Sequence, residues 1–202
     1  MDTIRHIEKY LSNIGTIADT IDKDAIVKTV DILTETKEKK GRLFVLGVGG
    51  GASGASHAVS DFRKISGIEA YAPTDNVSEL TARVNDEGWD SVFVNWLKVS
   101  NLTKNDCIFV LSVGGGNRER NISTNLVFAL QFAKEVGTRI LGVIGRDGGY
   151  TASVADAAII IPTISNEAIT PYTESFQAVI CHLLVSHPRL KSFEMKWESI
   201  NK

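Results

Sequence analysis

At 202 residues and 43% hydrophobic content, the chain can form one domain with a sizeable buried core, and no change in composition suggests a second. Its 22 basic and 24 acidic residues give a net charge of -2 and are spread along the chain, which argues against a nucleic-acid partner. With two cysteines, no apolar N-terminal stretch and no apolar run near the roughly 20 residues of a membrane span, we expect a cytoplasmic protein without membrane contact.

The first part of the chain, residues 1–40, predicts a pair of amphipathic helices. Apolar residues recur at helical spacing, namely Ile4, Ile7, Leu11 and Ile14 in the first helix and Ile26, Val27, Val30, Ile32 and Leu33 in the second. These two apolar faces would either cap the core or contact a partner chain.

Residues 41–187 predict an α/β core. Short apolar runs typical of buried parallel strands lie at 42–47, 69–72, 107–111, 139–144 and 157–161. Helical patterns alternate with them, at 55–65, 77–84, 90–99 and 121–135. This alternation predicts a doubly wound sheet with helices on both faces.

A long final helix is predicted from about residue 171 to residue 186. Thr170 would be its N-cap and Pro171 its first residue, a position that tolerates the missing proline N–H, and Pro188 follows its end. Residues 188–202 are then a C-terminal tail, and the whole chain, 1–202, is predicted to be a single domain.

Two glycine-rich loops follow predicted strands, at the sheet edge where open α/β proteins bind ligands. The first covers residues 47–53 and the second covers residues 112–117. Glycine lets backbone N–H groups approach an anion closely. A dinucleotide site would also need an acidic residue after the second strand, and residues 70–73 offer none, which disfavours a nicotinamide oxidoreductase. Two such loops suit one phosphate better than one nucleotide.

His57 and Asp61 are four residues apart in a predicted helix, so both side chains lie on one helix face. They could therefore act on one substrate or one metal ion. The alternative is that Asp61 pairs with Arg63 or Lys64 and that His57 is a packed histidine, because a metal site needs more than one such pair.

Glu174 and His182 raise the same question on the final helix. Eight residues correspond to a rise of about 12 Å, so a shared substrate is easier for the two side chains than a shared metal ion. The alternatives are that His182 belongs to the core and that Glu174 is a first-turn carboxylate that favours the helix dipole.

Taken together and in this order, the motifs resemble those of the SIS-domain phosphoheptose isomerases, the sedoheptulose 7-phosphate isomerase family. The family's Gly-Asn-Gly-Gly-Ser loop and His-x-x-x-Glu helix correspond to residues 47–51 and to His57 and Asp61. Its Asn-Asp-x-Gly segment corresponds to residues 85–88, and its Gly-Lys-Asp-Gly-Gly turn to residues 145–149. The resemblance extends over nearly the whole chain.

The final helix of the family, with glutamine eight residues before histidine, corresponds to the segment containing Glu174 and His182. The resemblance implies a flavodoxin-like, three-layer SIS domain with a five-stranded parallel sheet flanked by helices and preceded by the N-terminal helical pair. It also implies a homotetramer with active sites at the subunit interfaces.

The implied reaction is an aldose–ketose isomerisation, from sedoheptulose 7-phosphate to D-glycero-D-manno-heptose 7-phosphate through an enediol. One group moves a proton between neighbouring carbons, and another moves protons between the oxygens. Asp61 and His182 match these positions, with Asp61 expected as the carbon base and the exchanged roles left open. Some family members bind zinc at the positions of His57, Asp61, Glu174 and His182, so one divalent metal ion per subunit, expected to be zinc, is implied.

The expected substrate contacts come from both glycine loops and from two acidic residues. They are Gly49, Gly50, Gly51, Ser53, Asp86, Ser112, Gly114, Gly115, Gly116, Asn117, Arg118 and Glu174. The family's Ser-Thr-Ser-Gly-Asn-Ser phosphate loop is replaced here by residues 112–117, which lack most of the hydroxyl groups. Arg118 or Arg120 would then have to help to hold the phosphate, unless both are ordinary surface charges.

The altered phosphate loop also supports an alternative function, a sugar-phosphate binding or sensing module, because SIS domains are widely used as sensors. Such a module would show no turnover and would keep its ligand binding after the substitutions Asp61→Asn and His182→Gln. An isomerase would lose its activity with either substitution.

Overall fold

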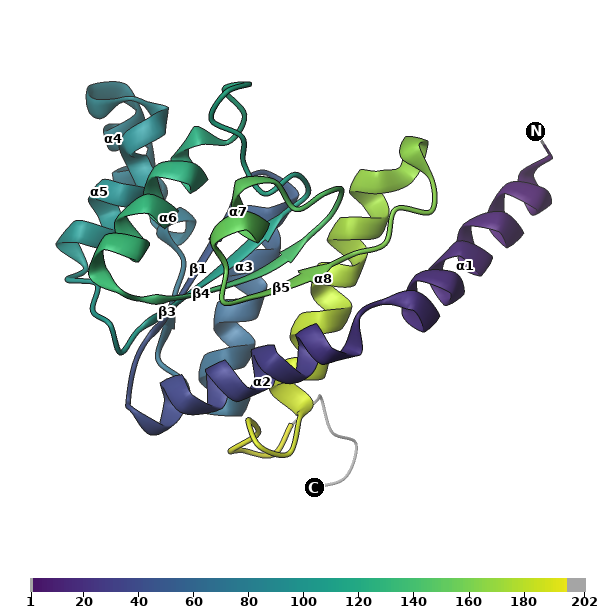
Figure 1. The fold of residues 1–202 in the computed structure, drawn as a ribbon, viewed down its shortest axis with the longest axis horizontal. Coiled ribbons are helices and arrows are strands. Elements are labelled where there is room, and N and C mark those ends of the chain that lie inside the picture. Colours follow the sequence, from purple (N-terminus) through teal and green to yellow (C-terminus); the bar gives the residue numbers. More distant parts are fainter. Residues whose placement is uncertain (1, 196–202) are drawn as a thin grey trace.

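The computed structural model describes residues 2–195, so residues 196–202 of the predicted C-terminal tail lie outside it (Figure 1). Five parallel strands form one sheet in the order β2-β1-β3-β4-β5. They are β1 Leu43–Gly47, β2 Ala70–Tyr71, β3 Cys107–Ser112, β4 Arg139–Ile144 and β5 Ala157–Ile160. This is the flavodoxin-like order, in which the chain reverses direction across the sheet between β1 and β3. The predicted fold class is confirmed.

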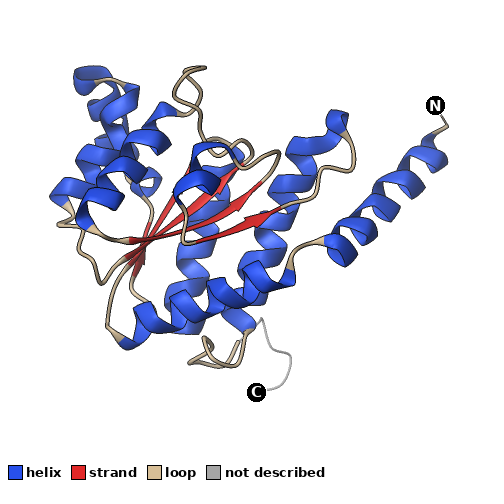
Figure 2. Ribbon diagram, in the orientation of Figure 1, coloured by secondary structure: helices blue, strands red, loops and turns tan. Residues whose placement is uncertain are grey.

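Helices cover both faces of the sheet (Figure 2). The α-helices are α1 Thr3–Thr20, α2 Lys23–Glu38, α3 Gly50–Asp61, α4 Val77–Glu87, α5 Val92–Val99, α6 Thr124–Val136, α7 Gly149–Val154 and α8 Ile169–Ser186. The shorter helical segments are Phe62–Ser66, Pro73–Asp75, Trp89–Ser91 and Asn166–Ala168. Helices α2, α3 and α8 pack on one face, and α4 to α7 pack on the other.

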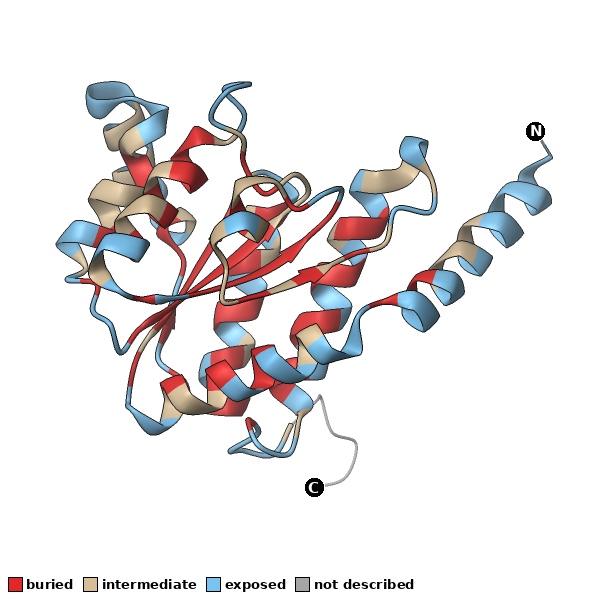
Figure 3. Cartoon of the chain, viewed as in Figure 1, coloured by how far each residue is buried: buried red, intermediate tan, exposed pale blue. Residues whose placement is uncertain are grey.

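Each central strand supplies both halves of the core because alternate side chains point to opposite faces. In β3, Phe109 belongs to the cluster under α3 and α8, whereas Ile108 and Val110 belong to the cluster under α5 and α6. All three side chains are fully buried, and the sheet is buried along most of its length (Figure 3). The strands therefore read as continuous apolar runs, as a sheet covered on both faces requires.

Helix α1 projects from the body of the molecule (Figure 1). Its C-terminal part is anchored through the buried Ile17, and Tyr10 packs against Tyr172 of α8 with ring centroids 4.6 Å apart. On its outer part Ile4 and Leu11 are 60% and 61% exposed. Among the helices of residues 2–195, none combines the length and the apolarity that crossing a membrane would need.

Several predicted boundaries are wrong by a few residues. Helix α8 begins at Ile169 with Ala168 as its N-cap, not at Pro171 with Thr170 as the N-cap. Pro171 fits there because the first N–H groups of a helix have no intrahelical partner. Helix α6 begins at Thr124, since residues 117 and 122 form a small antiparallel bridge before it.

The first glycine-rich stretch is mostly helix. Helix α3 begins at Gly50, Gly49 with φ +61° is its N-cap, and Gly47 is the last residue of β1. At its other end α3 continues into a π-helical turn, Phe62–Ser66, which starts directly after Asp61. Segments of this kind often occur at functional sites.

Candidate active site

Three of the predicted site residues meet between α3 and α8. The Asp61 Oδ2 atom lies 3.3 Å from His57 Nε2 and 3.4 Å from His182 Nε2, and the two imidazole Nε2 atoms are 3.5 Å apart. We call these side chains the His57–Asp61–His182 cluster. His57 and Asp61 are four residues apart, whereas His182 follows Asp61 by 121 residues along the chain.

The fold explains why these three side chains converge. His57 and Asp61 share a face of α3 through their i, i+4 spacing, and α8 packs beside α3 on the same face of the sheet. The Asp61 side chain is only 14% exposed, whereas those of His57 and His182 are 59% and 48% exposed. The carboxylate therefore lies at the base of the cluster, with the two imidazoles at its open side.

The alternative pairing of Asp61 with a neighbouring cation is not what the structure shows. Within residues 2–195, the basic side chains within 4 Å of the Asp61 carboxylate are the two histidines. Arg63 instead donates a hydrogen bond to the Ala70 carbonyl at 3.1 Å and lies over the Tyr71 ring.

The separations within the cluster fit a tetrahedral metal ion. With zinc–nitrogen and zinc–oxygen bonds of about 2.0–2.1 Å, two ligand atoms of a regular tetrahedron lie about 3.3 Å apart. The observed separations are 3.3, 3.4 and 3.5 Å. Two imidazoles and one carboxylate also form a donor set that catalytic zinc sites use. The three side chains therefore could hold a divalent cation without rearrangement.

Glu174 is not a member of this cluster. Its carboxylate lies against Gly50 at the start of α3. A Cβ atom on Gly50 would be 2.6 Å or less from the carboxylate atoms, so the carboxylate fits there only because residue 50 is glycine. A carboxylate is favoured at that position because a helix N-terminus carries partial positive charge. The first glycine stretch is thus occupied by an acidic side chain.

A small cavity borders the cluster and connects it with β3. It has a volume of about 20 Å³, and Gly54, Leu111 and Gln177 contribute to its wall beside the cluster residues. Gln177 is held in place by its Nε2 atom, which donates to the Val143 carbonyl at 3.2 Å. The next residue of β3 after Leu111 is Ser112, which lines a second and much larger cavity.

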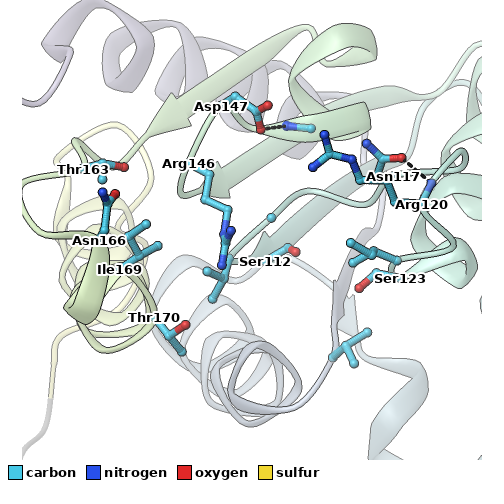
Figure 4. Close-up of a pocket in the computed structure, with 15 residues that line it drawn as sticks. Ser112, Asn117, Arg120, Ser123, Arg146, Asp147, Thr163, Asn166, Ile169 and Thr170 are labelled. Carbon is cyan, nitrogen blue, oxygen red and sulfur yellow. Dashed lines mark hydrogen bonds between the residues drawn. The ribbon is translucent and has the colours of Figure 1, made fainter.

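The larger cavity has a volume of about 650 Å³ and lies at the carboxyl ends of β1, β3 and β4 (Figure 4). This edge, next to the point where the strand order reverses, is where open α/β sheets bind ligands. The turn after β3, the turn after β4 and the segment leading into α8 form its walls. It is large enough for a small phosphorylated sugar.

The predicted substrate-binding residues are divided between several places. Ser112, Gly114 and Asn117 line the larger cavity. Gly116 and Arg118 line a neighbouring hollow of about 370 Å³, and the Arg118 guanidinium lies 5.8 Å from the centre of the Phe128 ring.

Other predicted contacts are farther from the cavity wall or have a structural role. Gly51 packs against the Leu111 carbonyl, and Gly115 packs against the Gly148 carbonyl, where a Cβ atom would be 1.9 Å away. Ser53 lies in the first turns of α3, and Asp86 lies on the surface of α4, accepting a hydrogen bond from Asn85 at 2.7 Å. Neither lines the larger cavity.

Sequence reasoning missed several residues of this cavity. Arg146 and Asp147 belong to a turn that the motif analysis identified without a role, and Thr163, Asn166 and Thr170 belong to the irregular segment before or at the start of α8. Glycine neighbours marked the first two, but no periodic pattern marks the other three.

Cys181 lies directly behind the cluster and is not available as a nucleophile. Burial, and after it the nearby Asp61 charge, raises the pKa of this thiol to about 12. The thiol therefore stays protonated in neutral solution, and the ionisable groups open to a ligand here are the carboxylate and the imidazoles.

Comparison with known proteins gives relatives along most of the chain. The phosphoheptose isomerase of Helicobacter hepaticus is 31% identical over 165 residues, covering 79% of this chain and 79% of that protein. The lincomycin biosynthesis protein LmbN of Streptomyces lincolnensis is 31% identical over 192 residues, covering 90% of this chain and 68% of that protein. No family model matches the chain.

Among solved structures, the phosphoheptose isomerase of Neisseria gonorrhoeae has a similar fold. The TM-score is 0.79 at 20% sequence identity, with 91% of this chain and 98% of that chain covered. The sheet and its flanking helices are therefore those of a known SIS-domain architecture.

Proposed function

The chain belongs to the phosphoheptose isomerase family, and from this premise we propose that it interconverts sedoheptulose 7-phosphate and D-glycero-D-manno-heptose 7-phosphate. The single observation that carries the proposal is the His57–Asp61–His182 cluster, which brings a carboxylate and two imidazoles within 4.8 Å of one another. An aldose–ketose isomerisation through an enediol needs a group of each kind.

The geometry supports different catalytic roles for Asp61 and His182. Asp61 takes the proton from carbon 1 of the ketose and delivers it to carbon 2, so one C–H bond breaks and another forms. His182 moves a proton from the hydroxyl oxygen on carbon 1 to the carbonyl oxygen on carbon 2, which leaves the aldehyde at carbon 1. The short distance between Oδ2 and Nε2, 3.4 Å, lets both side chains reach adjacent carbon atoms.

The proposal includes one zinc ion per subunit, with His57, Asp61 and His182 as its ligands. A zinc-bound Nε2 atom has no lone pair with which to move a proton, so the proton transfer by His182 belongs to the metal-free form of the site. A set of three protein ligands is characteristic of catalytic rather than structural zinc sites. When bound, the metal would polarise the substrate carbonyl and so favour enediol formation. Glu174, which lies apart from the cluster, is proposed to bind the substrate near the start of α3, and its role as a fourth metal ligand stays a prediction.

The proposed assembly is a homotetramer with sites at subunit interfaces. In support, the projecting helix α1 exposes Ile4, Ile7 and Leu11, and the His57 side chain at the open side of the cluster is 59% exposed. A second copy of the chain would cover such surfaces. A cytoplasmic location is part of the proposal, because both cysteines are free thiols, as is usual in a reducing compartment.

The test is turnover of sedoheptulose 7-phosphate in D₂O by the chelated and by the zinc-loaded protein, each followed by NMR. An isomerase that works through an enediol places deuterium from the solvent on carbon 2 of the aldose, because the proton that Asp61 takes up exchanges with D₂O before delivery. The substitutions Asp61→Asn and His182→Gln should each lower kcat about 10²–10⁴-fold. The matched control Glu135→Gln changes an exposed carboxylate on α6, which lies against the opposite face of the sheet, and should keep wild-type activity.

Two results would contradict the proposal. Binding of the sugar phosphate without any turnover would indicate a sensing module, above all if binding survives both substitutions. Full activity in Asp61→Asn would show that the cluster does not carry the chemistry.

A further inference from the structure

The turn after β4 holds one long side chain in an unusual backbone conformation. The Gly148 N–H donates to the Gly145 carbonyl at 3.0 Å and closes the turn, and Arg146 within it has φ +54°. This left-handed region is strained for a residue with a branched or long side chain. Residues held in this way cluster at binding and catalytic sites, because the surrounding structure must stabilise them.

The Arg146 side chain extends from this turn across the loop after β3 and into the larger cavity (Figure 4). The turn and the loop are joined by a hydrogen bond from the Gly145 N–H to the Val113 carbonyl at 3.1 Å. A Cβ atom on Gly114 would lie 4.0 Å from Arg146 Cδ, so a longer side chain at position 114 would compete with the arginine for the same space. The missing side chain at Gly114 therefore leaves room for the Arg146 side chain.

The cavity carries two cations whose charge is not neutralised by the protein. Within residues 2–195, neither the Arg146 nor the Arg120 guanidinium forms a hydrogen bond or an ion pair, although both line the cavity. The contrast is with Arg42 and Arg139, which pair with nearby carboxylates. Two such cations in one cavity repel each other unless an anion lies between them.

Acidic groups around the cavity do not supply that anion. Asp147 is the one carboxylate among the described residues that line it, and its Oδ1 atom accepts a hydrogen bond from the Gly149 N–H at 3.1 Å. The Glu174 carboxylate lies at the start of α3 and would repel a phosphate from that helix N-terminus. A phosphate is thus directed away from the first glycine stretch and toward the loop after β3.

We propose that Arg146, with Arg120, is the guanidinium clamp that binds the phosphate group of the substrate in this cavity. The clamp takes the place of a hydroxyl-rich loop, and it rests on the proposed function for the identity of the sugar. Guanidinium groups hold phosphate oxygens through paired, charge-assisted hydrogen bonds. Ser112 completes the site, because its oxygen accepts from the Gly115 N–H at 3.0 Å and its own O–H donates to no group within residues 2–195.

The test uses inorganic phosphate as the probe and does not depend on turnover. Calorimetry on the full chain should show that Arg146→Ala and Arg120→Ala each weaken phosphate binding about 10-fold or more, as expected for loss of a charged hydrogen bond. Arg146→Lys should keep part of the affinity. Lys104→Ala removes a charge from an exposed turn before the other end of β3, and this matched control should bind phosphate like the wild type.

A second variant separates binding from folding. Glycine adopts positive φ freely, so Arg146→Gly should raise Tm while it weakens phosphate binding and raises the KM for sedoheptulose 7-phosphate more than it changes kcat. Wild-type phosphate affinity in Arg146→Gly would overturn the clamp. If phosphate binding depends on Arg146 but no heptose phosphate is turned over, the clamp stands and the proposed substrate is wrong.

Discussion

Metal binding by the cluster predicts a large and specific change in thermal stability. A ligand that binds only the folded state at 1,000 times its Kd adds about 4.1 kcal/mol to the free energy of unfolding. For a chain of 150–250 residues, each kcal/mol shifts Tm by about 2–4 °C, so saturating zinc should raise Tm by about 8–16 °C. The separations of 3.3–3.5 Å between the three ligand atoms mean that no rearrangement would reduce this gain.

The assay compares thermal melts of chelated and zinc-loaded protein for the wild type, Asp61→Asn and Glu135→Gln. Asp61→Asn replaces the one anionic ligand with a neutral amide, so its zinc-dependent shift should disappear. Glu135→Gln should keep the full shift. An equal shift in wild type and Asp61→Asn would refute the reasoning, because the zinc would then be bound elsewhere, and the absence of any shift in the wild type would refute it as well.

Three further predictions concern the surroundings of the two sites. Asp106→Asn should lower the free energy of unfolding by about 3–5 kcal/mol in urea titrations, because the buried carboxylate accepts three hydrogen bonds from Arg42. Burial acts to raise the pKa of Asp106, but its hydrogen bonds outweigh this effect and hold the pKa below its usual value. The stability that the carboxylate contributes is therefore present at neutral pH and is lost on acidification. An unchanged urea midpoint for Asp106→Asn would contradict this prediction. Gly50→Ala should displace the Glu174 carboxylate and raise KM with little loss of stability. The control Gly15→Ala, at a position with open space around it, should leave KM unchanged. Equal KM values for the two variants would contradict the placement of Glu174. With its pKa raised to about 12, Cys181 should be a thiolate in about one molecule in 10⁴ at pH 8. It should therefore resist a thiol reagent until the protein is unfolded, and rapid labelling of the native protein would contradict this.

The sheet and the cluster were predictable because each rests on a short-range pattern. Buried parallel strands appear as apolar runs, and residues 139–144 match β4 to the residue. The i, i+4 spacing of His57 and Asp61 required only a helix, and a helix packed on the same face could bring His182 to them. Asp61 Oδ2 and His182 Nε2 lie 3.4 Å apart in the structure, and the catalytic roles of the two side chains stay a prediction.

The larger cavity was much less predictable. Its walls come from turns and irregular segments, whose positions depend on how the whole sheet is assembled. Arg146 stands in a recognisable glycine-rich turn, but its direction follows from a left-handed backbone and from the empty space at Gly114. Neither property is visible in a linear pattern of residues. The place of Glu174 beside Gly50 also depends on the lateral fit of α8 against α3, which the helical rise alone does not give.

The two sites differ in the kind of structure that carries them, and this bears on how the protein can change over evolutionary time. The His57–Asp61–His182 cluster is fixed by two packed helices, so a sequence change that shifted one helix relative to the other would separate its side chains. One wall of the larger cavity, with Thr163 and Asn166, belongs to the connection between β5 and α8, where insertions and deletions disturb no sheet pairing. Relatives built on this plan can therefore acquire a preference for longer or shorter sugars by remodelling one connection, while the proton-transfer machinery is inherited unchanged.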